Sequence, residues 1–364
     1  MAERLSRRAL NRATLARQWL LQRARATAID AVEHLVGLQA QAPFAPYYGL
    51  WSRLEDFQAA TLGQALIDGR MARAVGMRGT LHLVSARDCE SLRALAQPVM
   101  DRDLRQNVEH RHALAGLDQA RLRTAASALL TQGPLTPKEL GLKLHEAWPD
   151  IPPASLAHAA RGLLCLVQIP PRGVWGQSGA TRLALARDVL RTRTPRPQTL
   201  ADLARRFIAA FGPASVRDFQ TWSGLSRLQD TIDSLRPDLL SFESETGETL
   251  FDLPDAPRPG EGISAPVRLV APFDNLLLGY ADRHRVMDDE TRKRLFAAKN
   301  GLIPGALLID GFVAGAWDLK AEILSVSPYA KIPSAIEADI AAEARRLLDC
   351  AGLPDGRIEV GQAA

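Results

Sequence analysis

Residues 199–253 carry the pattern that most restricts how this 364-residue chain can fold. Apolar residues at helical spacing over 200–211 predict a first helix, and the Gly-Pro pair that follows ends it. Two serines, each three residues before an acidic or amide side chain, predict the starts of two further short helices. Extended runs at 239–243 and 249–253 then flank a Thr-Gly turn, which indicates a hairpin. Three helices followed by a hairpin make up a winged-helix module.

The same order of elements is found at 118–185. A helix over 118–133 precedes the stretch T-P-K-E at 136–139, in which threonine is the N-cap, proline the first helical residue and glutamate the capping partner. A third helix follows, and the runs 167–169 and 181–185 are the expected wing strands. This segment therefore predicts a second winged-helix module.

Residues 4–85 indicate a looser third copy, which is related to the other two by element order rather than by sequence identity. We expect its helices at 14–23, 27–41, 45–54 and 61–69, and its strand pair at 74–77 and 80–84. Beyond a Pro- and Gly-rich linker at 254–266, short apolar runs alternate with turns. That part is expected to be rich in β-structure, with a closing helix near 334–349.

The sequence thus predicts an α+β chain of tandem winged-helix (helix-turn-helix) modules with a C-terminal β-rich domain. We expect four domains: an N-terminal winged-helix-like module at 1–115, a second module at 116–195, a third at 196–258, and the β-rich domain with its closing helix at 259–364.

Composition limits the function classes only moderately. The net charge is +4, and all but six of the 45 basic residues are arginine, which suits bidentate phosphate contacts. GC-rich coding would give the same excess of arginine. Three widely spaced cysteines and seven histidines have no metal-ligand spacing, so we expect neither a metal nor another cofactor. No apolar run approaches membrane-span length and no signal peptide is visible, which predicts a cytoplasmic protein.

Two glutamines lie where the helix predicted at 27–41 ends. Gln39 extends the apolar face of that helix, and a buried amide must find partners or line a cavity. Gln41 lies about 200° around a continuing helix, so the two side chains do not share a face. Pro43 disfavours helical geometry at the residue before it, so we expect the chain to unwind there and let the glutamines converge. Two glutamines near a helix end are also ordinary surface chemistry.

Four stretches resemble the AlkZ-like family of bacterial DNA glycosylases. They are G-L-Q-A-Q-A-P-F-A-P-Y-Y-G-L-W-S-R-L (37–54), M-R-G-T-L-H-L-V (77–84), A-P-F-D-N-L-L-L-G-Y-A-D-R-H-R (271–285) and I-D-G-F-V-A-G-A-W (309–317). The resemblance implies tandem winged helices wrapped into a C-shaped DNA channel. It also implies a catalytic Gln-apolar-Gln motif, which is Gln39-Ala40-Gln41 here. A known relative has Gln-apolar-Asp instead, so this chain resembles the branch that unhooks interstrand crosslinks.

The implied chemistry agrees with the residue types. Alkylation at N7 of guanine or N3 of adenine makes the base cationic and weakens its glycosidic bond, so no strong acid is needed. Neutral amides can hold the attacking water and steady the sugar. No lysine lies near the motif, which predicts a monofunctional glycosylase. A crosslinked base cannot be fully flipped into a pocket, so an open groove is expected. We expect a monomer acting on duplex DNA with alkylated purines or crosslinks, in base excision repair or genotoxin resistance.

Six further residues are candidates for DNA contact: Arg78, His82, Arg172, Trp175, Arg283 and Arg285. For each of them, ordinary packing or solvation is the alternative. Winged helices also occur in regulators, in damage-binding proteins without activity and in protein-interaction modules. A regulator usually dimerises, and no long dimerisation heptad is visible. The glutamine motif favours the enzyme.

Overall fold

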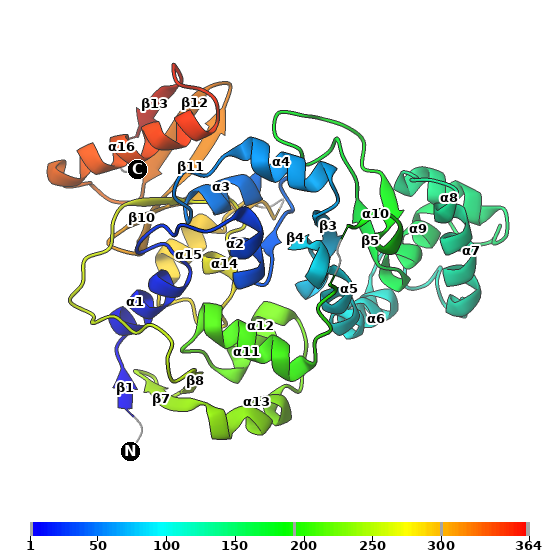
Figure 1. Ribbon diagram of the computed structural model, residues 1–364, viewed down its shortest axis with the longest axis horizontal. Coiled ribbons are helices and arrows are strands. Elements are labelled where there is room, and N and C mark those ends of the chain that lie inside the picture. The colour runs from blue at the N-terminus through cyan, green and yellow to red at the C-terminus, as the bar shows by residue number, and fades with distance from the viewer. Residues whose placement is uncertain (1–2, 192–193, 299–300, 362–364) are drawn as a thin grey trace. The chain divides into compact units, whose positions relative to one another are not determined.

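The structure is a computed structural model that describes residues 3–191, 194–298 and 301–361. The chain forms two compact units (Figure 1). Unit 1 comprises residues 1–59, 201–222 and 227–364, and unit 2 comprises residues 60–200 and 223–226. Both units contain helices and sheets, which confirms a mixed α+β fold. Within the described residues, no helix is both long and apolar enough to span a membrane.

Unit 2 is mainly helical, with a small sheet. Its helices are α4 (Ala59–Ile67), η1 (Met77–Gly79), α5 (Ala86–Leu95), α6 (Gln97–Gln106), α7 (Gln119–Thr131), α8 (Pro137–His145), α9 (Pro153–Leu163) and α10 (Ala186–Val189). Its strands are β3 (Met71–Val75), β4 (Leu81–Ser85), β5 (Leu166–Gln168) and β6 (Leu183–Leu185). They are hydrogen-bonded in the order β4-β3-β5-β6, and each neighbouring pair is antiparallel.

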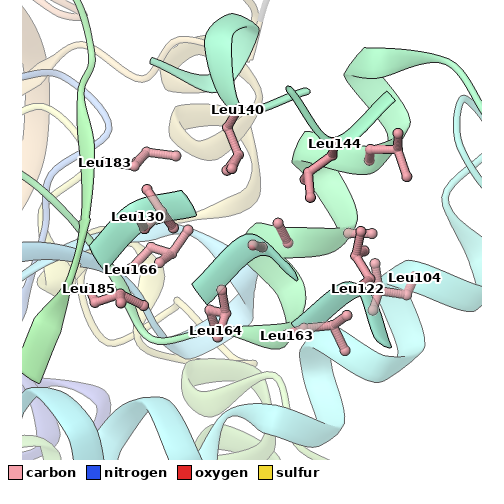
Figure 2. Packing of buried hydrophobic residues seen from close by; sticks show 14 residues of the cluster. Leu104, Leu122, Leu130, Leu140, Leu144, Leu163, Leu164, Leu166, Leu183 and Leu185 are labelled. Carbon is pink, nitrogen blue, oxygen red and sulfur yellow. The ribbon is translucent and has the colours of Figure 1, made fainter. Parts of the chain in front are cut away.

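The three helices and two strands predicted between 118 and 185 are present as α7, α8, α9, β5 and β6. The predicted capping box is confirmed: the Thr136 hydroxyl accepts from the Glu139 amide, and the Glu139 carboxylate accepts from the Thr136 amide. Leucines from these elements and from α6 form one core, shown in Figure 2. Leu122, Leu140 and Leu156 are fully buried within it. Burial of this leucine core fixes the helices against the β5–β6 pair.

Unit 1 contains the remaining elements. Its helices are α1 (Arg7–Arg17), α2 (Ala28–His34), α3 (Ala45–Trp51), α11 (Leu200–Phe211), α12 (Val216–Ser223), α13 (Gln229–Leu235), η2 (Arg236–Asp238), α14 (Asn275–Leu278), α15 (Asp289–Leu295) and α16 (Ser334–Cys350). Its strands are β1 (Glu3–Leu5), β2 (Leu38–Gln39), β7 (Leu240–Ser244), β8 (Thr249–Asp252), β9 (Arg268–Val270), β10 (Gly305–Ile309), β11 (Phe312–Lys320), β12 (Ile323–Pro328) and β13 (Arg357–Val360).

Two sheets organise unit 1. The hairpin predicted after 239 is present as β7 and β8, and β1 joins its edge in parallel with β7. The C-terminal part forms a five-stranded sheet in the order β13-β12-β11-β10-β9. Helix α16 packs its apolar face on that sheet (Figure 1), which confirms the closing helix predicted near 334–349. Whether the chain divides into the four domains expected from the sequence stays a prediction.

Two predicted helices have different bounds in the structure. The helix expected at 14–23 is α1, which begins after Ser6 because the Ser6 hydroxyl accepts from the Ala9 amide. It ends before Trp19, whose φ of 57° is left-handed. The helix expected at 27–41 begins at the predicted Thr27 cap but ends at His34. The second difference changes the geometry of the glutamine motif.

Candidate active site

The turn between α2 and β2 places the Gln39-Ala40-Gln41 motif. Val36 and Gly37 both have positive φ, 55° and 100°, so the chain leaves the helix there. The Gly37 amide donates to the Val32 carbonyl oxygen at 2.8 Å, and the Val36 amide donates to the Glu33 carbonyl oxygen at 3.2 Å. This pair of bonds is the Schellman arrangement that closes a helix. The motif therefore starts on a short strand and not on a helix.

The two glutamines differ in burial. Gln39 is the last residue of β2 and is only 7% exposed, which confirms the predicted buried position. Gln41 is exposed and lies in the bend after the strand. In an extended chain, residues two apart lie on the same face, so the side chains of Gln39 and Gln41 would point the same way. The unwinding expected at Pro43 is not needed for this, because α2 already ends at His34. Because Gln41 lies beyond the strand, convergence of the two amides stays a prediction.

A buried ion pair joins two of the sequence stretches that resemble the family. Arg53 donates to both carboxylate oxygens of Asp274, at 2.8 and 2.7 Å, and the side chains are 0% and 1% exposed. Arg53 also donates to the Gly49 carbonyl oxygen. Asp274 in turn caps α14 by accepting from the Leu276 amide at 2.9 Å. The stretches 37–54 and 271–285 are therefore parts of one packed site.

The end of α2 is held by side chains from other segments. The His34 ring stacks on Trp19 with centroids 4.5 Å apart, and its Nε2 donates to the Arg17 carbonyl oxygen 2.6 Å away. Burial lowers the pKa of His34 and so favours the neutral ring. Arg206 of α11 donates to the Glu33 carbonyl oxygen at 2.6 Å. The first contact satisfies the Arg17 carbonyl group at the end of α1, and the second adds a donor to the Glu33 carbonyl group in the last turn of α2.

Arg78 and His82, the predicted DNA contacts in the β3–β4 region, differ in burial. Arg78 is half-buried in η1, with a left-handed φ of 57°. His82 is 4% exposed, and its Nδ1 donates to the Thr80 carbonyl oxygen at 2.9 Å. Burial, reinforced by the charge of Arg78, lowers the pKa of His82 to about 3. A neutral buried imidazole lends no support to a phosphate contact by His82.

The predicted pair Arg172 and Trp175 lies in the loop between β5 and β6. Both side chains are half-buried. Arg172 donates to the Gly179 carbonyl oxygen at 3.3 Å, which closes the loop on itself. Their role in DNA contact stays a prediction.

The two side chains of the other predicted pair, Arg283 and Arg285, differ in burial. Arg283 is half-buried with its guanidinium 4.8 Å from the Phe296 ring, and burial lowers its pKa. Arg285 is 5% exposed, lies 4.0 Å over the Tyr280 ring and donates to the Pro213 carbonyl oxygen at 3.0 Å. Its location inside the protein gives no support to contact with DNA.

Charge is distributed unevenly along the chain, a signal that the total of +4 hides. Residues 60–200 contain 19 Lys and Arg against 11 Asp and Glu, a net charge of +8, and the rest of the chain has a net charge of −4. The segment 223–226 adds no charge to unit 2. A net positive unit attracts polyanions, and this asymmetry can be read from the sequence by counting charge for each segment.

Comparisons with known proteins extend the resemblance found in the sequence. A model of the family described as DNA glycosylase AlkZ-like matches residues 32–350. A protein from Streptomyces sahachiroi named interstrand DNA cross-link repair glycosylase is 24% identical over 338 residues, which are 86% of this chain and 88% of that protein. The solved structure of the Streptomyces sahachiroi DNA glycosylase AlkZ matches with a TM-score of 0.79 at 21% identity, over 99% of this chain and 100% of that one. The structural match shows a shared fold.

Proposed function

Because this chain belongs to the AlkZ-like DNA glycosylase family, we propose that it hydrolyses the N-glycosidic bond of bulky alkylated purines in duplex DNA. The proposed substrates are nucleotides that carry an N7-alkylguanine. Interstrand crosslinks are included because the relative from Streptomyces sahachiroi is named for their repair. The main structural support for the proposal is Gln39, a polar side chain that is only 7% exposed. It lies on a short strand that follows a turn with left-handed backbone. A buried amide at a constrained position is suited to orienting a reactant.

The proposed reaction needs no acid from the protein. The bond between C1′ and the cationic base breaks, and its electron pair neutralises the base. Water adds its oxygen to C1′ and releases a proton to solvent. Gln39 and Gln41 fix that water through amide oxygen and nitrogen and stabilise the cationic sugar. An amide has no useful pKa, so its part is positioning rather than proton transfer.

The enzyme is proposed to be monofunctional. The first lysine of the chain is Lys138, so the segment that contains the motif has none to form a Schiff base with the sugar. The product is then an abasic site, and strand cleavage needs added alkali.

DNA binding is assigned in this proposal to two winged-helix modules, α7–α9 with β5–β6 and α11–α13 with β7–β8. The net charge of +8 over 60–200 supports binding to phosphates, with Arg172 and Trp175 in the loop of the first module. The C-shaped channel implied by the family resemblance is part of the same proposal. We expect a monomer that acts in the cytoplasm on the nucleoid, in alkylation repair or genotoxin resistance.

The test uses duplex DNA with one N7-methylguanine, or with one nitrogen-mustard crosslink. The wild type is compared with the Gln39→Ala/Gln41→Ala double variant and with the matched Gln64→Ala/Gln229→Ala variant, whose glutamines are exposed on helices. We expect alkali-labile sites with the wild type and the matched control, none with the motif variant, and no strand cleavage without alkali. Tight binding by the wild type without base release would instead support a regulator or a damage-binding protein.

A further inference from the structure

A buried asparagine reaches the turn that precedes the glutamine motif. Asn275 is the first residue of α14 and is 2% exposed. Its side-chain Nδ2 donates to the carbonyl oxygen of Gly37 at 2.8 Å. Gly37 lies two residues before Gln39. The bond is not needed to begin α14, because the carboxylate of Asp274 already caps that helix.

The bond joins two segments whose backbone is strained. Val36 and Phe273 have φ angles of 55° and 58°, the left-handed region that side chains with a Cβ rarely adopt. This conformation brings Cβ close to the following carbonyl oxygen, and the strain is greatest for a β-branched residue such as valine. Such conformations persist only where the surroundings hold them, and they cluster at functional sites. Here one lies directly before Gly37 and the other two residues before Asn275.

Asn275 has a fixed base from which to hold the turn. The preceding Asp274 is bound through both oxygens to Arg53, and both of those side chains are buried. The Leu38 side chain packs near the same place, since its Cδ1 lies 3.7 Å from where a Cβ on Gly49 would stand. Gly37 is thus bonded to Asn275, and Leu38 lies beside Gly49, whose carbonyl oxygen accepts from Arg53.

We propose that Asn275 is a positioning residue that sets the place of Gln39 through the Gly37 carbonyl. This inference rests on the proposed glycosylase function. Without the bond, the Gly37 peptide can rotate and carry Gln39 away from the water that it orients. A displacement of about 1 Å at a reacting group costs roughly 10²-fold in rate. Binding of the DNA duplex does not use this bond, so affinity is retained.

The test measures three quantities on each variant: the single-turnover rate of 7-methylguanine release, the Kd for the lesion duplex, and the melting temperature. Asn275→Ala removes the donor. Asn11→Ala is the matched control, because Asn11 is equally buried and donates to the carbonyl oxygens of Arg285 and Gly311, both at 2.8 Å. We expect Asn275→Ala to release base roughly 10- to 100-fold more slowly with unchanged Kd. The control should melt lower than the wild type but keep its rate.

A second variant, Asn275→Asp, keeps the shape but donates only when its carboxyl group is protonated. Its rate should rise as pH falls, towards that of the wild type, and Asn275→Ala should show no such rise. A wild-type rate for Asn275→Ala overturns the inference while the proposed function stands, and so does an Asn11→Ala rate that falls as far. Absence of base release by the wild type overturns the proposed function itself. If Asn275→Ala does not fold, a flat pH profile of Asn275→Asp overturns the inference.

Discussion

The buried pair of Arg53 and Asp274 gives the sharpest stability prediction. Asp274→Asn keeps the side-chain shape and an oxygen that can cap α14, but it leaves the Arg53 guanidinium, 0% exposed, without its counter-charge. Removing one partner of a buried pair costs about 3–5 kcal/mol. In a unit of this size each kcal/mol lowers the melting temperature by about 2–4 °C, so we expect a fall of roughly 6–20 °C.

Thermal unfolding followed by calorimetry measures this fall. Two variants serve as controls. The double variant Arg53→Met/Asp274→Asn removes the uncompensated charge and should regain much of the loss. Arg25→Ala breaks the exposed pair with Glu55 and should have the melting temperature of the wild type, because solvent screens that pair. The buried pair does not have this effect on stability if Asp274→Asn has the melting temperature of the wild type, or if the double variant is no more stable than Asp274→Asn.

Three further predictions concern other parts of the chain. The pKa of His82 is about 3 in the folded protein, against 6.5 for an ordinary histidine. The unfolded chain therefore binds the proton first, and stability falls as the pH drops from 6.5 towards 3. Thermal melts across this range should show a smaller fall in melting temperature for His82→Leu than for the wild type. Gly311 has a φ of 79°, and an added Cβ would lie 2.5 Å from Asn11 Oδ1. Gly311→Ala should therefore lower the free energy of unfolding, measured in urea, by about 1–3 kcal/mol. An unchanged urea midpoint would contradict this. Leu122→Ala should lose about 2–5 kcal/mol because Leu122 is fully buried (Figure 2), whereas the exposed Leu142→Ala should lose little; equal losses would contradict the assigned core.

Local signals predicted the elements that depend on local chemistry. The Thr136–Glu139 box and the apolar stripe over 200–211 gave helices α8 and α11 close to their observed bounds. The turn after 244 gave the hairpin of β7 and β8. In these cases capping, period and turn residues all indicate the same structure, so neighbouring residues suffice.

Features set by distant segments were not predictable in this way. Strand β1 forms by pairing with β7, more than 230 residues away. The end of α2 depends on Val36 adopting a conformation that its own side chain disfavours. Gly37 was therefore the local signal for the end of this helix. Burial of Gln39 was predicted, but it arises on a strand instead of a helix face. Arg285 resembles a surface arginine in sequence, and only the fold supplies Tyr280 and the Pro213 carbonyl.

Single-turnover kinetics measure whether Gln39 and Gln41 position the water for base excision. The rate of 7-methylguanine release is measured for the wild type, Gln39→Ala and Gln41→Ala, against spontaneous loss from the same duplex. We expect release by the wild type well above the spontaneous rate. In each variant we expect a loss of roughly 10²-fold or more, as when one preorganised polar group is removed. Wild-type rates in both variants, or no enzymatic release at all, would contradict this role of the two glutamines.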